Sequence, residues 1–282
     1  MIIGTQAFTC GGDAGRRQDR ALDALASLRG VTAVNLQWPD DVVDRDGLRT
    51  VATLRHDSRT VTKCQGPRKP ITTDVLDALA AVAKAEGHDY FCYLNSDIVV
   101  TQAAVDLIAS GRKDTYAFSR LDLDADGRPV GMLLYGVDMV AFKVAWWEAH
   151  RRRFRPYILG EPLWDNVYAA VMMCHGDGAM LNRTGLIEHE CHEPARVPNA
   201  FLHHNGWLAA LDSRHFSIWV RYCEAVVAAR ACGASEEEER AIAAETFVWR
   251  PSAASAIWDA GRRLKAHIRY RRQLAAAAFG SV

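Results

Sequence analysis

Hydrophobic residues in the first hundred positions form short runs that alternate with helical stripes. Leucines at 22, 25 and 28 predict a helix over residues 16–29, and a second apolar stripe follows Thr72 and Thr73 as far as Gly87. The apolar runs at residues 1–8, 31–38 and 89–94 predict strands, and the last is apolar enough for a strand covered on both faces. Strands that alternate with helices predict a doubly wound α/β sheet.

Beyond residue 110 the pattern is less regular. Residues 116–121 and 131–142 predict two strands that the Asp126-Gly127 pair joins by a turn. Ser235 with Glu238 three residues later predicts a capping box for a helix that starts near residue 236. Neither an internal repeat nor a long linker interrupts the sequence, so we expect one main domain.

Composition narrows the class of protein. The 282 residues include 34 Lys and Arg against 34 Asp and Glu, which excludes a nucleic-acid binder that works by a globally basic surface. Seven widely spaced cysteines predict reduced thiols rather than a disulfide framework. We expect no signal peptide, because the N-terminal residues lack a basic region, and no run approaches the length of a spanning helix. These features predict a cytoplasmic protein whose partner is held in a pocket.

The most informative segment is Asn95-Ser96-Asp97. Asp97 follows the predicted central strand, where open α/β sheets place their ligands, and Thr101 is expected to cap the next helix. Ordinary turn or capping chemistry is the alternative for an Asn-Ser-Asp triplet. Arg68 and Lys69 precede the helix that leads into this strand, and as cations they could meet a diphosphate.

An apolar strand that ends in an Asp-x-Asp-like triplet, after a loop and helix with a basic residue, resembles the nucleotide-sugar-dependent glycosyltransferases of the GT-A fold. The resemblance implies a three-layer α/β/α fold with a mostly parallel mixed sheet. It also implies a divalent ion, Mn²⁺ or Mg²⁺, that bridges the two donor phosphates and stabilises the departing nucleoside diphosphate. Asp97 is then a metal ligand. Asn95 stands where the family has its first Asp, which leaves metal dependence open.

The resemblance extends to further residues, each of which has a structural alternative. Gly136 and Asp138 match a Gly-x-Asp segment that contacts the donor sugar. Asp165 matches the acidic residue of the acceptor-side loop, where it would act as the general base of an inverting enzyme or position substrate in a retaining one; a helix cap is the alternative. The expected donor contacts are Thr5, Gln6, Arg68, Lys69, Asn95, Ser96 and Asp97, and the expected acceptor-side contacts are Trp164 and Asn166.

A second metal ligand is expected from His203-His204, because His203 and Gly206 match the His-x-x-Gly segment of some retaining enzymes of this fold. A structural His pair in a loop is the alternative. The cluster from Glu188 to Glu193 suggests a zinc hydrolase, but its His-Glu-Cys-His spacing is one residue short of the zincin helix. If this segment is a strand, the side chains of His189 and His192 point to opposite faces of the sheet.

The resemblance therefore implies a hexosyltransferase-type glycosyltransferase of polysaccharide biosynthesis, which takes a nucleoside-diphosphate sugar and a hydroxyl acceptor. The alternatives are a sugar-binding pseudoenzyme or a sugar nucleotidyltransferase. The segment from Thr9 to Arg17 loosely resembles the phosphate loop of the nucleotidyltransferases. We expect a catalytic domain over 1–250, with a nucleotide-binding half to about 125 and an acceptor half from about 126, and a basic amphipathic helix over 251–282. That helix packs on the domain or contacts the inner face of a membrane.

Overall fold

The computed structural model describes residues 1–183, 185–192, 199–249, 261 and 263–273. They fall into two compact units, each assembled from separate stretches of chain. The first unit contains Met1–Arg55, Val75–Arg152 and the described residues from 175 to 192. The second contains His56–Asp74, Arg153–Cys174 and the described residues from 199 onward. The domain boundaries expected near residues 125 and 250 stay predictions.

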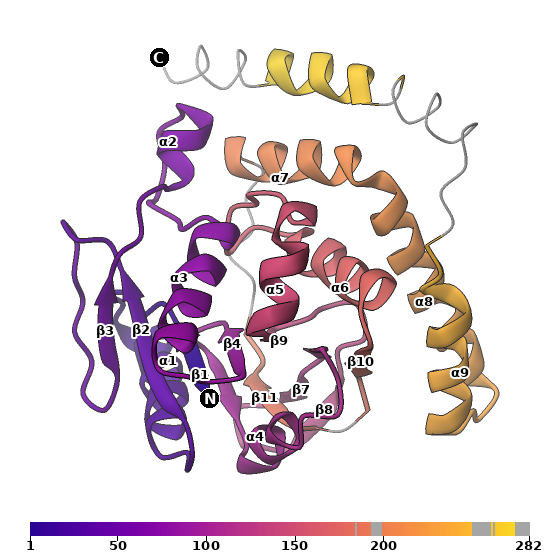
Figure 1. The fold of residues 1–282 in the computed structure, drawn as a ribbon, viewed down its shortest axis with the longest axis horizontal. Helices are drawn as coiled ribbons and strands as arrows, with labels where there is room; N and C mark the ends of the chain where they lie inside the picture. The colour runs from indigo at the N-terminus through magenta and orange to yellow at the C-terminus, as the bar shows by residue number, and fades with distance from the viewer. Residues whose placement is uncertain (184, 193–198, 250–260, 262, 274–282) are drawn as a thin grey trace. The chain divides into compact units, whose positions relative to one another are not determined.

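The first unit is built on a mixed sheet of seven strands, which confirms the predicted fold class. The strand order is β10-β6-β9-β4-β1-β2-β3, and Figure 1 shows most of these labels in that order across the view. Neighbouring strands are parallel except that β9 runs antiparallel to β4 and β6. The bounds are β1 (Ile2–Thr5), β2 (Thr32–Gln37), β3 (Arg49–Ala52), β4 (Tyr90–Leu94), β6 (Thr115–Phe118), β9 (Met139–Lys143) and β10 (Gly178–Leu181).

Strands β1 and β4 lie side by side near the middle of this sheet, and every residue of both is buried. Their continuous apolar character follows from helices covering both faces of a largely parallel sheet. The chain continues from β1 to β2 on one side of the pair, and the strands beyond β4 lie on the other. Parallel sheets bind ligands at the carboxyl ends of strands where the order diverges in this way, here at Thr5 and Asn95.

A second sheet of four strands has the order β5-β11-β7-β8. Its strands are β5 (Ile98–Val100), β7 (Leu121–Leu123), β8 (Pro129–Met132) and β11 (Ile187–Glu190). The prediction of single strands over 116–121 and 131–142 was wrong, because each segment is divided between the two sheets. Gly127, with a φ of +78°, does form the predicted turn, but it joins β7 to β8. The hydrophobic pattern does not show where the chain leaves one sheet for the other, because apolar residues continue from β8 through residues 133–137 toward β9.

The helices of the first unit follow the predicted stripes closely. α1 (Gly12–Ala26) starts four residues before the predicted helix, and α4 (Gln102–Ala109) is capped by Thr101, whose hydroxyl accepts from the Ala104 amide. α3 (Thr72–Ala85) begins at Thr72 as predicted, and α5 (Val144–His150) continues into a short 3-10 turn, η1 (Arg151–Arg153).

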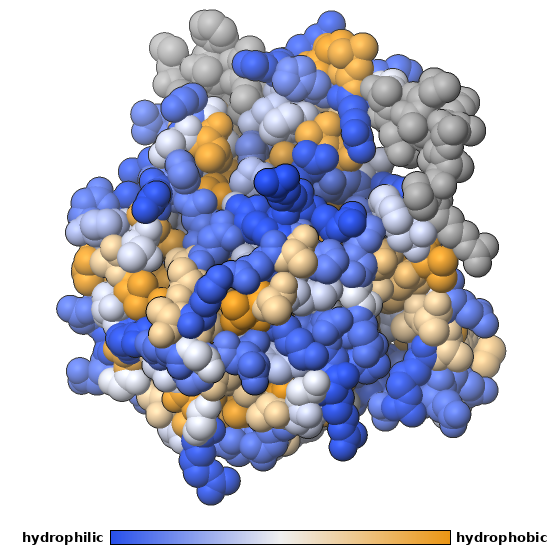
Figure 2. All heavy atoms as spheres, viewed as in Figure 1, coloured by the Kyte–Doolittle hydropathy of each residue, from blue (hydrophilic) through white to orange (hydrophobic). Residues whose placement is uncertain are grey.

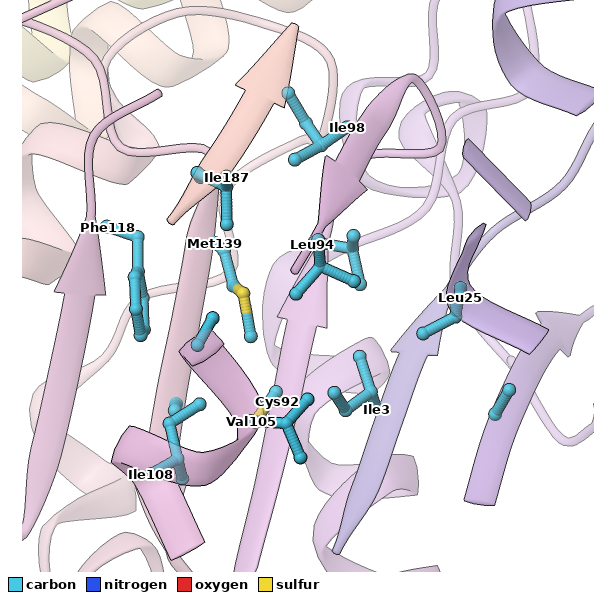
Figure 3. Packing of buried hydrophobic residues seen from close by; sticks show 14 of the residues in the cluster. Ile3, Leu25, Cys92, Leu94, Ile98, Val105, Ile108, Phe118, Met139 and Ile187 are labelled. Atoms are coloured by element: carbon cyan, nitrogen blue, oxygen red, sulfur yellow. The ribbon is translucent and has the colours of Figure 1, made fainter. Parts of the chain in front are cut away.

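One core connects the two sheets of the first unit. Figure 3 shows Ile98 and Ile187, from the second sheet, near Leu94 and Met139 at the ends of β4 and β9. Ile98, Ile187 and Met139 are fully buried, and Leu94 is 2% exposed. At roughly 25 cal/mol per Å² of apolar surface, burial of this kind is the main stabilising contribution, and it fixes the loop between β4 and β5 against β11.

The second unit is mainly helical. It contains α2 (Ser58–Thr62), the start of α3, α6 (Trp164–His175) up to Cys174, α7 (Ala200–Leu211), α8 (Ser213–Ala231) and α9 (Glu236–Thr246). Asp212 ties its parts together, because it accepts hydrogen bonds from Arg155 Nε at 2.7 Å and Tyr157 Oη at 3.2 Å. The capping box predicted from Ser235 and Glu238 is present at the start of α9.

The predicted C-terminal helix is described only in part. Residues 263–273 are helical and include Leu264 and Ile268 of the predicted apolar stripe, whereas its third member, Ile257, lies outside the described residues. Leu264 and Ile268 are 63% and 45% exposed, so these two side chains do not pack the helix against the rest of the protein as expected. Tyr270 provides this packing instead, since its ring stacks on Trp207 of α7 at 4.6 Å. Contact of this basic segment with a membrane stays a prediction.

Polar side chains cover much of the face shown in Figure 2, with apolar ones in small groups. None of the helices in the described ranges has the length and apolar character needed to cross a membrane. All seven cysteines lie in the described ranges and are unpaired.

Gly4 tests the packing of β1 against α3. A Cβ at this position would lie 2.2 Å from Leu79 Cδ2, whereas Gly131 on β8 has nothing within 4 Å of the same point. We expect Gly4→Ala to lower the free energy of unfolding by about 1–3 kcal/mol through overpacking. Gly131→Ala should change it by less than about 0.5 kcal/mol. Urea unfolding of both variants measures this, and equal stabilities would contradict the described packing.

Candidate functional site

The segment Asn95-Ser96-Asp97 forms a turn at the carboxyl end of β4. The Ile98 amide donates to the Asn95 carbonyl at 3.2 Å, so the turn chemistry considered as an alternative is present. This turn does not exclude a ligand site, because it leads directly into β5 and leaves the Asp97 carboxylate 36% exposed. The turn therefore presents one carboxylate at the edge shared by β1 and β4.

Pairing within the second sheet brings His189 to this carboxylate. β11 pairs with β5 so that His189 lies opposite Ile98, and it pairs with β7 so that His189 also lies opposite Asp122. His189 is 4% exposed, with Nε2 at 3.7 Å from an Asp97 oxygen and Nδ1 at 3.0 Å from an Asp122 oxygen. One buried imidazole thus lies between two carboxylates.

His192 completes the group from the other end of the same segment. β11 ends at Glu190, so His192 is no longer bound to the alternation of the strand, and its ring lies 5.0 Å from that of His189. Its Nε2 is 3.5 Å from the same Asp97 oxygen. Asp97, His189 and His192 offer ligand atoms that all lie within 4.8 Å of one another, which suits a single metal ion.

The donor chemistry of this group requires positive charge at its centre. A carboxylate only accepts hydrogen bonds, so the Asp122 contact places a proton on His189 Nδ1. In a neutral imidazole, Nε2 is then an acceptor, and it faces Asp97 oxygen, a second acceptor. A proton or a cation between them resolves the conflict. Although burial raises it, the pKa of Asp97 is lowered overall by its hydrogen bonds to His189 and His192 and by the His189 charge.

A chain of polar contacts extends from this group to Asp138. Arg120 donates to Asp122 at 2.8 Å and to Asp138 Oδ1 at 3.1 Å, and Asn95 donates its amide to the same Asp138 oxygen at 3.1 Å. Asn95 is therefore engaged with Asp138 through its amide nitrogen, while its side-chain oxygen lies 3.5 Å from the Tyr93 hydroxyl. Burial raises the pKa of Asp138, and the Arg120 charge opposes that rise.

Three buried polar atoms near the strand ends have no hydrogen-bond partner among the described residues: Thr5 Oγ1, Gln6 Nε2 and Asp138 Oδ2. All three belong to residues that the sequence assigned to donor binding. Buried polar groups are nearly always paired, so unpaired ones at the carboxyl edge of a sheet are candidates for ligand contacts. Gly136 lies beside Asp138, because a Cβ on it would be 3.6 Å from Asp138 Oδ2.

Helix α1 adds cations to the same place. A small pocket is lined by Arg17 and Arg20 together with Asp97 and His189. Arg16 forms a two-point pair with the buried Glu190, which lowers the pKa of Glu190 mainly through that hydrogen bond. Arg17, by contrast, has no hydrogen-bond or ion-pair partner in the described part of the chain. These arginines were not among the expected site residues, although their loop was noted for its likeness to a phosphate loop.

The cations that were expected to meet the diphosphate are paired elsewhere. Arg68 donates to Asp57 at 2.9 Å, and Lys69 donates to Glu161 at 2.8 Å, both within the second unit. Each pair would have to open before its cation could bind a phosphate. Phosphate binding by Arg68 and Lys69 stays a prediction, and it would require these ion pairs to break.

The expected acceptor-side residues lie at the start of α6, also in the second unit. Trp164 is 5% exposed and packs edge-on against Tyr168, so in the described structure it serves the packing of the helix and offers no open face to a sugar. Asp165 is the second residue of α6, with its carboxylate 3.4 Å from the side-chain amide of Asn166. It is not the N-cap, because Leu163 precedes the helix, so the capping alternative is wrong.

His203 and His204 lie on helix α7 rather than in a loop. Neither belongs to a group of described residues that could hold a metal ion. His204 is buried, with Nδ1 at 2.7 Å from Tyr270 Oη. Burial lowers the pKa of His204 to about 4, opposed only in part by the Pro156 carbonyl. Among the described residues, the group that could hold a metal ion contains His189 and His192 instead.

Sequence reasoning missed His189 and His192 for an identifiable reason. The segment was recognised as rich in metal-binding residues, but it was judged by its internal spacing alone. Its true partner, Asp97, is supplied by the pairing of β11 with β5, which no local pattern reveals. The end of β11 at Glu190 also removes the strand alternation that would have separated the two imidazoles.

Comparisons with known proteins assign no family to the chain. No family model matches it, and no curated protein matches it. Among solved structures, residues 1–349 of S. aureus TarS align with 99% of this chain and 91% of their own length, at 11% identity and a TM-score of 0.47. A longer S. aureus TarS chain aligns over 78% of this chain and 42% of its own length, at 10% identity and a TM-score of 0.43.

A protein from Desulfovibrio desulfuricans G20, provisionally described as a nucleotide-diphospho-sugar transferase, aligns over 51% of this chain and 63% of its own length. The identity is 14% and the TM-score 0.29. This chain therefore spans less than two thirds of that protein and of the longer TarS chain. At such low similarity, function has to be argued from the residues of the site.

The buried His204 makes a stability prediction. Its folded pKa of about 4 lies below the ordinary 6.5, so the unfolded chain binds the extra proton between these values. The free energy of unfolding should fall by about 3 kcal/mol as pH drops from 7 to 4 because of this residue. Urea unfolding at several pH values should show a shallower fall for His204→Gln. The matched control His203→Gln should follow the wild type, and an unchanged His204→Gln profile would contradict the prediction.

Proposed function

We propose that this protein transfers a sugar from a nucleoside-diphosphate sugar to a hydroxyl acceptor, with a divalent ion held by Asp97, His189 and His192. The observation that carries the proposal is a group of side chains at the carboxyl end of β4 that could hold a metal ion. Two of them, Asp97 and His189, line a small pocket with Arg17 and Arg20. A diphosphate needs both a cation and phosphate-binding side chains, and the switch point of an α/β sheet is where such ligands bind.

The leaving group explains why this combination suits glycosyl transfer. Cleavage of the bond between the anomeric carbon and the phosphate leaves negative charge on the nucleoside diphosphate. The bound ion supplies Lewis-acid stabilisation of that charge. Arg17, which has no ion pair of its own among the described residues, is available to bind a phosphate oxygen, and Arg20 lines the same pocket beyond its pair with Glu190.

The unpaired polar atoms support binding of the rest of the donor. Thr5 and Gln6 at the end of β1 would meet the nucleoside, and Asp138 would accept from a sugar hydroxyl through its unpaired Oδ2. Arg120 and Asn95 already hold the other Asp138 oxygen, so this carboxyl is oriented before the ligand arrives. Ser96 lies in the turn between Asn95 and Asp97, where it would reach the ribose or a phosphate.

Asp165 is the proposed acidic residue of the acceptor side. In an inverting reaction it would take the proton of the acceptor hydroxyl as that oxygen attacks the anomeric carbon. In a retaining reaction it would position the acceptor instead. Its support is its place in the first turn of α6, where the helix dipole favours a carboxylate in its ionised form.

A sugar nucleotidyltransferase is a second candidate. The sequence from Thr9 to Arg17, which leads into the first turns of α1, loosely resembles the phosphate loop of that class, and Arg17 lines the pocket with Asp97. Such an enzyme would join a sugar phosphate to a nucleoside triphosphate and release diphosphate. Incubation with a nucleoside triphosphate and hexose 1-phosphates distinguishes it, because a glycosyltransferase forms no nucleotide sugar from them.

Binding of a nucleoside diphosphate tests the site first. Isothermal titration with Mn²⁺ and a panel of nucleoside diphosphates should show metal-dependent binding that is lost in Asp97→Asn. Arg17→Ala should raise the Kd by about tenfold to a hundredfold, the range expected for a charged hydrogen bond. Arg128→Ala, which removes an exposed arginine from the β7–β8 turn, is the control and should bind normally. Binding that is insensitive to Asp97 would refute the proposal.

Turnover tests Asp165. Donor hydrolysis or transfer should fall by about 10² to 10⁴-fold in Asp165→Asn, while the Kd for the nucleoside diphosphate stays within twofold. A proportional loss of binding would instead indicate a structural role. Donor binding without any turnover in the wild type would favour the sugar-binding pseudoenzyme.

A further inference from the structure

The geometry points to a site that selects a nitrogen-binding transition ion, such as Mn²⁺, Fe²⁺, Co²⁺ or Zn²⁺, over Mg²⁺, and to Asp122 as the residue that positions its buried ligand. This inference rests on the proposed function because both use the same site. It adds the chemical class of the ion and the role of Asp122, which is not itself a ligand.

The donor set carries the first step. Two of the three ligand-bearing side chains are imidazoles, His189 and His192, and only Asp97 is a carboxylate. Mg²⁺ prefers oxygen ligands at near-octahedral positions, whereas imidazole suits the later divalent ions. Asn95, at the place of the family's first Asp, donates its amide nitrogen to Asp138, and its side-chain oxygen faces the Tyr93 hydroxyl at 3.5 Å. The site therefore contributes more nitrogen than oxygen to an ion.

The second step concerns the protonation pattern of His189. Its Nδ1 donates to Asp122 at 3.0 Å, so its Nε2 is the atom left to bind an ion, and this atom faces Asp97 at 3.7 Å. A second carboxylate behind a ligating histidine fixes both the tautomer and the ring orientation, and raises the basicity of the ligand. Arg120 holds Asp122 in turn at 2.8 Å. Asp122 thus acts on the ion through His189.

The third step concerns access. His189 is buried, but His192 and Asp97 are 31% and 36% exposed in their side chains. Three protein ligands are fewer than the four to six that these ions take. The group therefore has coordination capacity left for ligand oxygens, and two of its three members are partly accessible to solvent.

Cobalt spectroscopy on the full chain tests this without any need for turnover. Co²⁺ bound through imidazole gives visible d–d absorption bands that report the ligands directly. We expect Co²⁺ to bind with such bands, and a hundredfold excess of Mg²⁺ to leave them unchanged. His189→Ala and His192→Ala should abolish or shift the bands, while the control His203→Ala should keep them.

Asp122→Asn should weaken Co²⁺ binding by about 10- to 100-fold and shift the bands, as expected for loss of a carboxylate that orients a ligating histidine. Asp122→Glu should recover part of the affinity. Circular dichroism identifies variants that do not fold, and His189→Gln, with a side chain closer in size, replaces His189→Ala in that case. Normal binding in Asp122→Asn would overturn its positioning role.

The inference fails if the wild type gives no bands, if the bands survive in both histidine variants, or if Mg²⁺ displaces Co²⁺ readily. Failure of the proposed function gives a different result. A protein that binds Co²⁺ through both histidines but never binds a nucleoside diphosphate retains the site and loses the glycosyltransferase assignment. One that transfers sugar with Mg²⁺ alone, independently of His192, retains the assignment and loses the inference.

Discussion

The position of His189 between two carboxylates is the constraint on which the site depends. β11 pairs with β5 on one side and β7 on the other, so the imidazole faces Asp97 through one nitrogen and Asp122 through the other. A neutral imidazole can donate to only one of them. The second contact is then favourable only with positive charge beside it. The sheet register, fixed by the buried pair of Ile98 and Ile187, therefore creates a place that favours a cation.

The charges around this place balance poorly without one. Asp97, Asp122 and Asp138 lie together with one fully charged partner, Arg120, and burying carboxylates without compensation costs several kcal/mol each. The network reduces this cost by hydrogen bonds, and the raised pKa of Asp138 shows that the compensation is incomplete. A divalent ion at Asp97 would complete it. Arg17 and Arg20 line a small pocket together with Asp97 and His189.

The sequence predicts those parts of the fold that local periodicity determines. β1, β2, β4 and α3 were expected within a few residues, because each is a continuous run or stripe that ends at its own turn or cap. The strands over 116–121 and 131–142 were not resolved, since apolar residues continue along the chain where it passes from one sheet to the other. Asp97 was found because it follows an obvious buried strand. Its histidine partners were missed because they come from a pairing almost a hundred residues away in the chain, and His203 was chosen on a short motif that lies on a helix.

The central claim is that Asp97, His189 and His192 hold one divalent ion that receives a diphosphate. A crystal structure of the protein with Mn²⁺ and a nucleoside diphosphate, recorded at a wavelength where manganese scatters anomalously, tests it most directly. The account predicts one strong anomalous peak in contact with Asp97, His189, His192 and phosphate oxygens. A bound diphosphate with no peak at these residues, or a peak held by other side chains, would contradict it.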